Sequence, residues 1–387
     1  MPLTVLHTSD SHLDVPAIKF GSRRYERKND FLKSFDTVIR YALEKKPDLF
    51  LHSGDLFDGL NPRNPVRAHV MEAFRKLHEK QIPICIISGN HDVPRSRRHG
   101  VAPLLEYKKA GFIHFFQAWD EIQSETLSLQ GLEVEVSGIS FNPTIAPSED
   151  PLMNLSIPGK GDVTILLAHY NVEGLRGTFP YEPDIMLRSI PKNLTYMAAG
   201  HNHEFQKQKV GNTTICTPGS TEHVSFAEET QKKGFVWLEM DTDGVHTLKQ
   251  VPVDTRPMQT LEIMIPKDAD INQMLIKEIN RLRNPQLILR FRLKGVMTIK
   301  SAEKYRRTTV VNHGYAKCFS TEVIDELEYQ SPDQELLSTE TELKPPITEY
   351  REYVTALLKK EKEKEKQQLL KKALERGIGL LEDTGGW

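Results

Sequence analysis

Cysteine is scarce in this sequence of 387 residues. The three cysteines, Cys85, Cys216 and Cys318, lie far apart, and no two of them form a CxxC pair. This spacing excludes a disulfide framework and a zinc site built from cysteines. Isolated thiols of this kind are typical of a protein that works in a reducing compartment.

Long apolar runs, an N-terminal leader and a strong charge imbalance are also missing. No apolar run approaches the length of a membrane span, and MPLTVLHTSD enters a strand-like pattern without a basic-then-apolar leader. The formal net charge of −2 argues against a general binder of polyanions. We therefore expect no membrane contact and a cytoplasmic location, associated with the nucleoid if the substrate is DNA.

Roughly the first two thirds of the chain alternates short β-rich runs with amphipathic helices. LTVLHTSD, PDLFLHSGD and QIPICIISGN are typical of strands, and the stretches between them have apolar residues at helical spacing. From about residue 105, short strands separated by Gly, Pro or Asn follow. We expect an α/β fold in which a second sheet packs on the first, giving a two-sheet β-sandwich flanked by helices.

Smaller parts follow this region. QTLEIMIP, DINQMLIKEINRLR and PQLILRFRLKG predict a compact β-α-β set, and YQSPDQELLSTETELKPP is typical of a polar linker. The chain is therefore expected to comprise a main domain, a smaller α+β domain, a linker and C-terminal helices, over residues 1–256, 257–328, 329–345 and 346–387.

Two apolar blocks at helical spacing mark the C-terminal helices. The first block is Ile347, Tyr350, Val354 and Leu357, and the second is Leu369, Leu370, Ala373 and Leu374. A solvated terminal helix is a common alternative, but neither block has an obvious partner within the chain, and an apolar stripe needs a surface to bury it. We expect a helical hairpin that binds a partner. The chain lacks the P-loop GxxxxGK followed by Ser or Thr, so any control by ATP must act through such a partner.

Five polar clusters lie at or just beyond the ends of predicted strands. They are SDSH, SGDLFD, SGNHD, AHYN and AGHNH, which begin at residues 9, 53, 88, 168 and 199. Each alone has a simpler explanation, since Asp-x-His in a loop is usually a cap or a turn, and a lone His169 is usually a satisfied core histidine. Ligands bind at the carboxyl ends of strands in open α/β sheets, so the joint occurrence favours one shared site.

The side chains of these clusters are those of a divalent metal site. They supply carboxylates, imidazoles and amides, and they include no thiolate, which argues against structural zinc. Such a mixed set fits two metals that share a bridging carboxylate and clamp both oxygens of an in-line phosphoryl displacement. The pattern indicates metal-assisted hydrolysis of a phosphate ester.

The order DSH…GDLFD…GNHD…H…GHNH resembles the calcineurin-like metallophosphoesterases. More narrowly, HTSDSHLD, LFLHSGDLFD, ISGNHD and TPGSTEHVSFAEE resemble the Mre-eleven/SbcD nucleases of DNA double-strand-break repair. The resemblance covers roughly residues 3–255. It extends more loosely to the β-α-β unit, which corresponds to the family's DNA-capping domain, and to the C-terminal helices, its ATPase-binding region.

The resemblance implies a metal-binding role for seven residues. The first metal is bound by Asp10, His12 and His203, the second by Asn90, His169 and His201, and Asp55 bridges the two. The usual ions in such families are manganese or a similar divalent metal.

Catalytic roles are also implied by the resemblance. His91 takes no metal and either stabilises the charge developing on the phosphate or protonates the leaving oxygen, with Asp92 beside it as an orienting acceptor. Some nucleases of this family carry a histidine, linked to exonuclease action, where this chain has Asp58. Cleavage polarity and the balance of exo- and endonuclease action therefore stay open.

Basic residues gather just downstream of three clusters, in KFGSRRYERK, NPRNPVR and PRSRRH. Any one of these loops alone is typical of solvated surface, but three on the rim of one cleft suit a polyanion backbone. The candidate DNA contacts are Arg23, Arg24, Arg63, Arg67, Arg95, Arg97 and Arg98.

The leading hypothesis is a metal-dependent DNA exo/endonuclease acting at DNA ends in double-strand-break repair. By resemblance, its partner is an SbcC/Rad-type coiled-coil ATPase, in an assembly with two copies of each chain. Two alternatives remain. One is a free-standing phosphodiesterase or phosphatase for cyclic nucleotides or phosphoproteins, and the other is a DNA-end-binding scaffold with vestigial catalysis.

Overall fold

The computed structural model describes residues 2–96, 100–153, 155–175, 182–329 and 346–383. One compact unit comprises Met1–Ile265, Ala269–Gly295 and Lys304–Glu326, and a second comprises Pro266–Asp268, Val296–Glu303 and Leu327–Trp387. Most of the predicted α+β domain thus shares a unit with the predicted main domain. The predicted domain boundaries stay predictions, and all of the predicted linker except Tyr329 lies outside the described residues.

The first sheet has six strands in the order β14-β13-β1-β2-β3-β4. Their bounds are β1 (Leu3–Thr8), β2 (Leu49–Ser53), β3 (Ile84–Ile87), β4 (His114–Phe116), β13 (Gly234–Asp241) and β14 (Gly244–Pro252). Strands β1 to β4 are mutually parallel, whereas β13 runs antiparallel to β1. The carboxyl ends of β1, β2 and β3, where three of the polar clusters begin, therefore meet at one edge of the sheet.

The second sheet also has six strands, in the order β11-β12-β10-β7-β6-β5. Their bounds are β5 (Gln123–Leu129), β6 (Leu132–Ile139), β7 (Val163–Ala168), β10 (Tyr196–Ala199), β11 (Gln206–Val210) and β12 (Thr213–Thr217). Strands β7 and β10 are parallel neighbours, and Ala168 pairs with Ala199 at their carboxyl ends. The two remaining polar clusters therefore begin side by side. A short strand pair, β8 (Asn171–Val172) with β9 (Asp184–Ile185), packs on the outer face of this sheet, together with the turn η2 (Leu187–Ser189).

Alternate side chains of the central strands face two different cores. Leu51, Cys85 and Ile165 belong to the buried cluster between the two sheets. Phe50 and Ile86, one residue along in their strands, belong to the cluster that contacts the helices. This period of two is expected of strands buried on both faces. The prediction of a two-sheet sandwich flanked by helices is confirmed.

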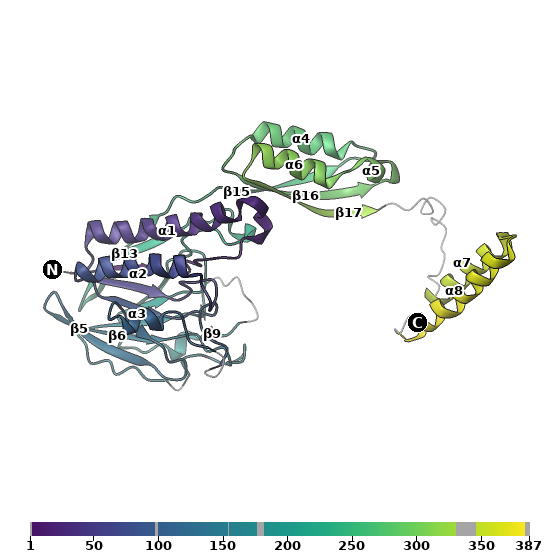
Figure 1. Ribbon diagram of the computed structural model, residues 1–387. Coiled ribbons are helices and arrows are strands. Elements are labelled where there is room, and N and C mark those ends of the chain that lie inside the picture. The colour runs from purple at the N-terminus through teal and green to yellow at the C-terminus, as the bar shows by residue number, and fades with distance from the viewer. Residues whose placement is uncertain (1, 97–99, 154, 176–181, 330–345, 384–387) are drawn as a thin grey trace. The chain divides into compact units, whose positions relative to one another are not determined.

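Helices α1 (Arg24–Lys45) and α2 (Asn64–Glu79) cover the outer face of the first sheet (Figure 1). Phe31, Phe35 and Val38 of α1 recur at helical spacing and are buried against it. The turn η1 (Ile18–Arg23) leads into α1, and α3 (Leu105–Lys109) precedes β4.

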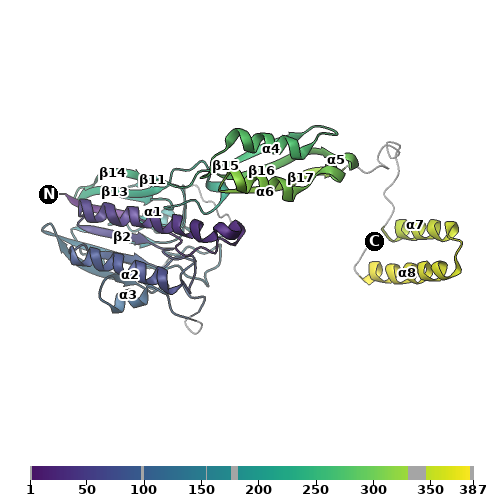
Figure 2. The same cartoon turned by 45° about the horizontal axis from the view of Figure 1, so that its top comes forward.

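A three-stranded sheet in the order β15-β16-β17 follows the sandwich in the chain. Its elements are β15 (Met258–Ile265), α4 (Ile271–Leu282), β16 (Ile288–Met297), α5 (Ile299–Lys304), α6 (Arg307–Lys317) and β17 (Ser320–Tyr329). Strands β15 and β16 are parallel with α4 between them, which is the predicted β-α-β set. Helices α4 and α6 lie side by side on one face of this sheet (Figures 1 and 2).

The C-terminal helices α7 (Pro346–Lys360) and α8 (Lys364–Asp383) form an antiparallel hairpin (Figure 2). Tyr350 Oη donates a hydrogen bond to Ala373 O over 2.9 Å, and Val354 is buried. The expectation that neither apolar block has a partner within the chain is therefore corrected, because each block partly covers the other. No helix in the described ranges is long and apolar enough to cross a membrane.

Candidate metal centre

The polar clusters adopt unusual backbone conformations where they leave the strands. Asp10, His12, Asp55 and His201 have φ values of 51°, 44°, 52° and 77°. Side chains other than glycine rarely adopt this left-handed region, which costs about 1–3 kcal/mol per residue and concentrates at functional sites. The fold thus accepts strain at four of the seven predicted metal ligands.

One group of ligand atoms comes from the loops that follow β1 and β10. Single ligand atoms of Asp10, His12 and His203 all lie within 4.8 Å of one another. The Nε2 atoms of the two imidazoles face each other at 3.1 Å, and His203 Nε2 lies 3.7 Å from Asp10 Oδ1. All three residues are buried. These are the residues predicted to bind the first metal.

A second group adjoins the first. Asn90 Oδ1 lies 3.2 Å from His169 Nε2 and 3.2 Å from His201 Nδ1. The Asp55 carboxylate lies between the two groups, with Oδ2 at 3.2 Å from His169 Nε2 and 3.8 Å from His12 Nε2. The structure thus brings all seven predicted ligands together, with the predicted bridging residue in the middle.

The donor set fits divalent metal ions. Among the described residues, the buried Asp10 Oδ1 has no hydrogen-bond partner, although it lies 3.7–3.8 Å from two imidazole nitrogens. A buried carboxylate oxygen without a partner is costly, and a cation would satisfy it. His12 and His203 also converge through their Nε2 atoms at 3.1 Å, and imidazole nitrogens turned toward one point suit a shared metal ion.

Glycines keep the loops close to these ligands. A Cβ atom at Gly89 would lie 2.2 Å from Asp55 Oδ1, and one at Gly200 would lie 2.1 Å from Ser53 O. No side chain fits at such distances. Gly89 and Gly200 are therefore required by close packing around the ligands rather than by turn conformation.

The ring nitrogens that point away from the ligand groups have their own partners. His12 Nδ1 lies 3.1 Å from Asp58 Oδ1, His203 Nδ1 lies 3.1 Å from Glu228 Oε1, and His169 Nδ1 donates to Ser53 O over 2.7 Å. Such partners hold the proton on Nδ1 and leave the Nε2 lone pair for a metal. His201 Nε2 lies 2.6 Å from Glu182 Oε2.

Two of these outer carboxylates, Glu228 and Glu182, were not among the predicted site residues. Glu228 belongs to the turn η3 (Phe226–Glu228), where it forms a capping box with Ser225. The Ser-x-x-Glu spacing was a readable signal for the turn but not for the contact with His203. Nothing in the sequence around Glu182 indicates its contact with His201.

The electrostatics of the centre reflect its buried carboxylates. Burial lowers the pKa of His12, but the hydrogen bond with Asp58 and the charges of Asp55 and Asp10 outweigh burial and raise it to about 9. Burial likewise lowers the pKa of His169, and the Asp55 carboxylate more than compensates, raising it to about 10. The centre therefore attracts positive charge.

His91 lies at the exposed side of the centre. Its side chain is 40% exposed, whereas the predicted ligand imidazoles are nearly buried. Its backbone N–H donates to Asp55 Oδ1 over 2.9 Å, and its Nδ1 lies 3.8 Å from Asp58 Oδ1. A ring atom of His91 also lies within 4.8 Å of ligand atoms of His12 and Asp55. An incoming phosphate can thus reach this ring from solvent.

Asp92 does not have the predicted orienting contact with His91. Its Oδ1 accepts the Gly89 N–H at 2.9 Å, and its Oδ2 accepts the N–H groups of Leu56 and Phe57 at 3.0 and 3.3 Å. The prediction that Asp92 orients His91 is therefore wrong. The Asp92 carboxylate instead joins the SGNHD loop to the SGDLFD loop. Asp58 lies beside both rings instead, with its Oδ1 at 3.1 Å from His12 Nδ1 and 3.8 Å from His91 Nδ1.

The predicted DNA contacts differ in their surroundings. Arg23 donates to the carbonyl oxygens of Tyr315, Cys318 and Phe319, so it is occupied within the chain. Arg63 pairs with Asp14 at 2.8 Å, and Arg67 pairs with Glu106. Arg24 contacts Tyr25, and Arg95 is exposed. Arg97 and Arg98 lie outside the described residues.

Comparisons with known proteins agree with this geometry. Residues 3–205 match the profile of the family described as calcineurin-like phosphoesterase. The chain is similar to DNA double-strand break repair protein Mre11 of Methanocaldococcus jannaschii, with 28% identity over 73% of this chain and 75% of that protein. The Methanococcus maripaludis protein of that name is 29% identical over 73% and 74%, and that of Sulfolobus acidocaldarius 26% over 77% and 76%. Because the matched profile spans more than half of the chain and its metal-ligand types converge in one centre, this protein belongs to the calcineurin-like phosphoesterase family and is a metal-dependent phosphoesterase.

Proposed function

We propose that the protein is a two-metal-dependent DNA exo/endonuclease that hydrolyses phosphodiester bonds at DNA ends during double-strand-break repair. The observation that carries this proposal is the convergence of two ligand groups on the Asp55 carboxylate. Its relatives bear the name DNA double-strand break repair protein Mre11, which supports DNA as the substrate.

The proposed ligands divide into two sets around a shared carboxylate. Asp10, His12 and His203 would hold one ion, Asn90, His169 and His201 would hold the other, and Asp55 would be shared. The mixed carboxylate, imidazole and amide donors suit divalent ions, and Mn²⁺ is the ion expected from the family that the motifs resemble. When bound, the ions supply an activated water and neutralise charge on the phosphate.

The chain's own catalytic group in this proposal is His91. Because Asn90 is a ligand, the adjacent His91 is held beside the bound phosphate by the backbone. Its exposed ring donates a proton to the leaving oxygen or a hydrogen bond to the developing charge. Asp58, 3.8 Å from His91 Nδ1, serves as its orienting carboxylate. A substitution of Asp58 should therefore alter the balance of exo- and endonuclease action.

The C-terminal hairpin is the proposed docking site for an SbcC/Rad-type coiled-coil ATPase. Tyr353, Leu369 and Leu380 are 64%, 71% and 60% exposed although the two helices pack on each other. Such large apolar side chains favour a surface that a partner covers. We also propose a homodimer, with two copies of each chain in the complex, located in the cytoplasm with the nucleoid.

End-labelled linear DNA incubated with Mn²⁺ tests the proposal, with cyclic nucleotides and a phosphopeptide as competing substrates. We expect Mn²⁺-dependent cleavage of DNA, removed by EDTA and restored by added Mn²⁺. Robust turnover of cyclic nucleotides without DNA cleavage would refute the nuclease assignment. DNA-end binding without cleavage of any substrate would favour a scaffold.

A further inference from the structure

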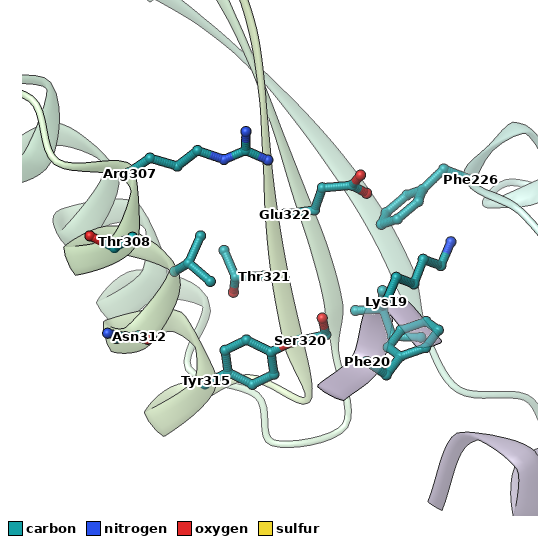
Figure 3. Close-up of a pocket in the computed structure, with 12 residues that line it drawn as sticks. Lys19, Phe20, Phe226, Arg307, Thr308, Asn312, Tyr315, Ser320, Thr321 and Glu322 are labelled. Atoms are coloured by element: carbon teal, nitrogen blue, oxygen red, sulfur yellow. The ribbon is translucent and has the colours of Figure 1, made fainter. Parts of the chain in front are cut away.

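A pocket of about 380 Å³ lies apart from the metal ligands, where the sandwich meets α6 and β17 (Figure 3). Lys19, Phe20 and Phe226 line one side, and Arg307, Asn312 and Tyr315 of α6 line the other. Strand β17 crosses between the two sides, as Figure 3 shows for Ser320 and Glu322. A volume of this size is within the range of small-ligand sites.

Two arginines, the half-buried Arg23 and the buried Arg256, hold the two sides of this pocket together. Arg23 donates to the carbonyl oxygens of Cys318 and Phe319 over 2.6 Å in each case. Arg256 donates to both oxygens of Asp30 over 2.6 and 2.8 Å, and its guanidinium lies 3.6 Å from the centre of the Phe319 ring. The pocket is therefore part of a tightly bonded junction, not a gap between loosely packed loops.

The charge around the pocket is positive. Lys19 and Arg307 line it and are exposed. Arg290 lies beside it, with its guanidinium 3.8 Å from the centre of the Phe226 ring and 3.1 Å from Glu322. These three cations face the single carboxylate of Glu322, which Arg290 already engages. An anionic ligand is therefore favoured.

Aromatic rings accompany these cations on both sides of the pocket. The half-buried Tyr315 lies on the α6 side, with the amide of Asn312 at the rim, and the buried Phe20 and Phe226 lie on the sandwich side (Figure 3). Rings beside cations are the combination by which proteins hold single-stranded nucleic acid, since bases stack on the rings while the cations contact phosphates. Polar groups such as Asn312 can contact the edge of a base.

We propose that this pocket receives an unpaired nucleotide of the DNA strand, with the base against the ring of Tyr315 and the phosphate between Lys19 and Arg307. This proposal rests on the proposed nuclease function and adds a preference for substrates with single-stranded segments. The pocket and the metal centre share the turn η3, because Phe226 lines the pocket while Glu228, two residues on, contacts the ligand His203. A strand held in the pocket is thus close to the centre.

Binding of a single-stranded oligonucleotide containing 2-aminopurine, whose fluorescence falls on stacking, tests the pocket directly. The variants are Arg307→Ala, Tyr315→Leu and Asn312→Glu. Asn312 is exposed, so a glutamate there can repel a bound phosphate without disturbing the core, which keeps the test valid if Tyr315→Leu fails to fold. Arg281→Ala, an exposed arginine of α4 outside the pocket, is the matched control.

We expect Tyr315→Leu to abolish the quenching and weaken single-strand binding about 5-fold or more, from the stacking energy of one base. Arg307→Ala and Asn312→Glu should also weaken single-strand binding, because the first removes a cation beside the phosphate and the second adds a repelling carboxylate. Binding of blunt duplex and Mn²⁺-dependent hydrolysis of bis-p-nitrophenyl phosphate should stay unchanged, as should every readout for Arg281→Ala. Unchanged single-strand binding in Asn312→Glu, or equal losses for single strand and duplex, would refute the pocket.

Free deoxyadenosine monophosphate is the competing ligand. If it displaces the oligonucleotide only at far higher concentration than an unlabelled single strand, the strand assignment stands. If it competes as well as the strand, the pocket is a site for free nucleotides and the proposal is wrong. Failure of the proposed nuclease function is a separate result, because the unmodified protein would then cleave no DNA with Mn²⁺.

Discussion

Replacing Glu228 by glutamine should lower both the affinity of the centre for metal and the stability of the fold. Glu228 Oε1 lies 3.1 Å from His203 Nδ1, and its Oε2 pairs at 2.6 Å with Lys233, whose side chain is fully buried. Glu228→Gln preserves shape but removes the charge. It should weaken Mn²⁺ binding about 10- to 100-fold, the usual loss when the outer partner of a ligand histidine is changed. It should also lower the free energy of unfolding by about 3 kcal/mol or more, because the ammonium of Lys233 loses its buried counter-charge.

The double variant Glu228→Gln/Lys233→Met distinguishes these two effects. Without the ammonium there is no buried unpaired charge, so urea unfolding in EDTA should recover most of the lost stability. Mn²⁺ affinity, measured by calorimetric titration, should stay low, because the partner of His203 is still changed. If the double variant recovers metal affinity together with stability, Glu228 acts only through packing and the assigned role is wrong. Unchanged affinity in the single variant would also refute it.

Three further changes test the centre itself. His91→Gln should retain Mn²⁺ and DNA binding but lower DNA cleavage by about 10²-fold or more, the usual contribution of a positioned acid or base; normal cleavage would exclude the role assigned to His91. Gly89→Ala should weaken Mn²⁺ binding at least about 10-fold, because the new Cβ would lie 2.2 Å from Asp55 Oδ1; unaltered affinity in a calorimetric titration would contradict this packing. Asp92→Asn removes one of two oxygens that accept three main-chain N–H groups and should lower the free energy of unfolding in EDTA by about 1–3 kcal/mol; an unfolding curve identical to that of the unmodified protein would show that these bonds are dispensable.

The five clusters that contain the predicted ligands could be found from the sequence because each lies at or just beyond a strand end, and the family resemblance then assigned the seven ligands within them. Parallel strands bring their carboxyl ends to one edge, so clusters that are far apart in sequence are expected to meet. His169 shows the strength of this reasoning, since a lone histidine after VTILLA carries no signal by itself. Its contact with Asn90 arises because β7, which precedes His169, and β3, which precedes Asn90, end close together in the two sheets of the sandwich.

The contacts that the sequence did not reveal depend on side-chain direction rather than on chain topology. Asp92 is adjacent in sequence to His91, but its carboxylate points to the N–H groups of Leu56 and Phe57. Arg23 occurs in a basic run that suggested DNA, yet its guanidinium binds carbonyl oxygens of residues about 300 positions later. The apolar blocks of α7 and α8 were each expected to need a partner outside the chain, but the two helices pack against each other.

The charge balance of the centre argues that its buried carboxylates require a cation. Asp10 and Asp55 lie within the sandwich at 1% exposure, where an unpaired carboxylate is strongly disfavoured. Burial alone would raise the pKa of Asp55, but the charges of His169 and His12 lower it instead, and the same carboxylate raises the pKa of both histidines. The buried carboxylates therefore favour the protonated form of His12 and His169 when no other cation is near. Divalent ions supply that positive charge, and their binding displaces the protons from the Nε2 atoms. Burying these carboxylates lowers the stability of the metal-free protein, and metal binding restores that stability.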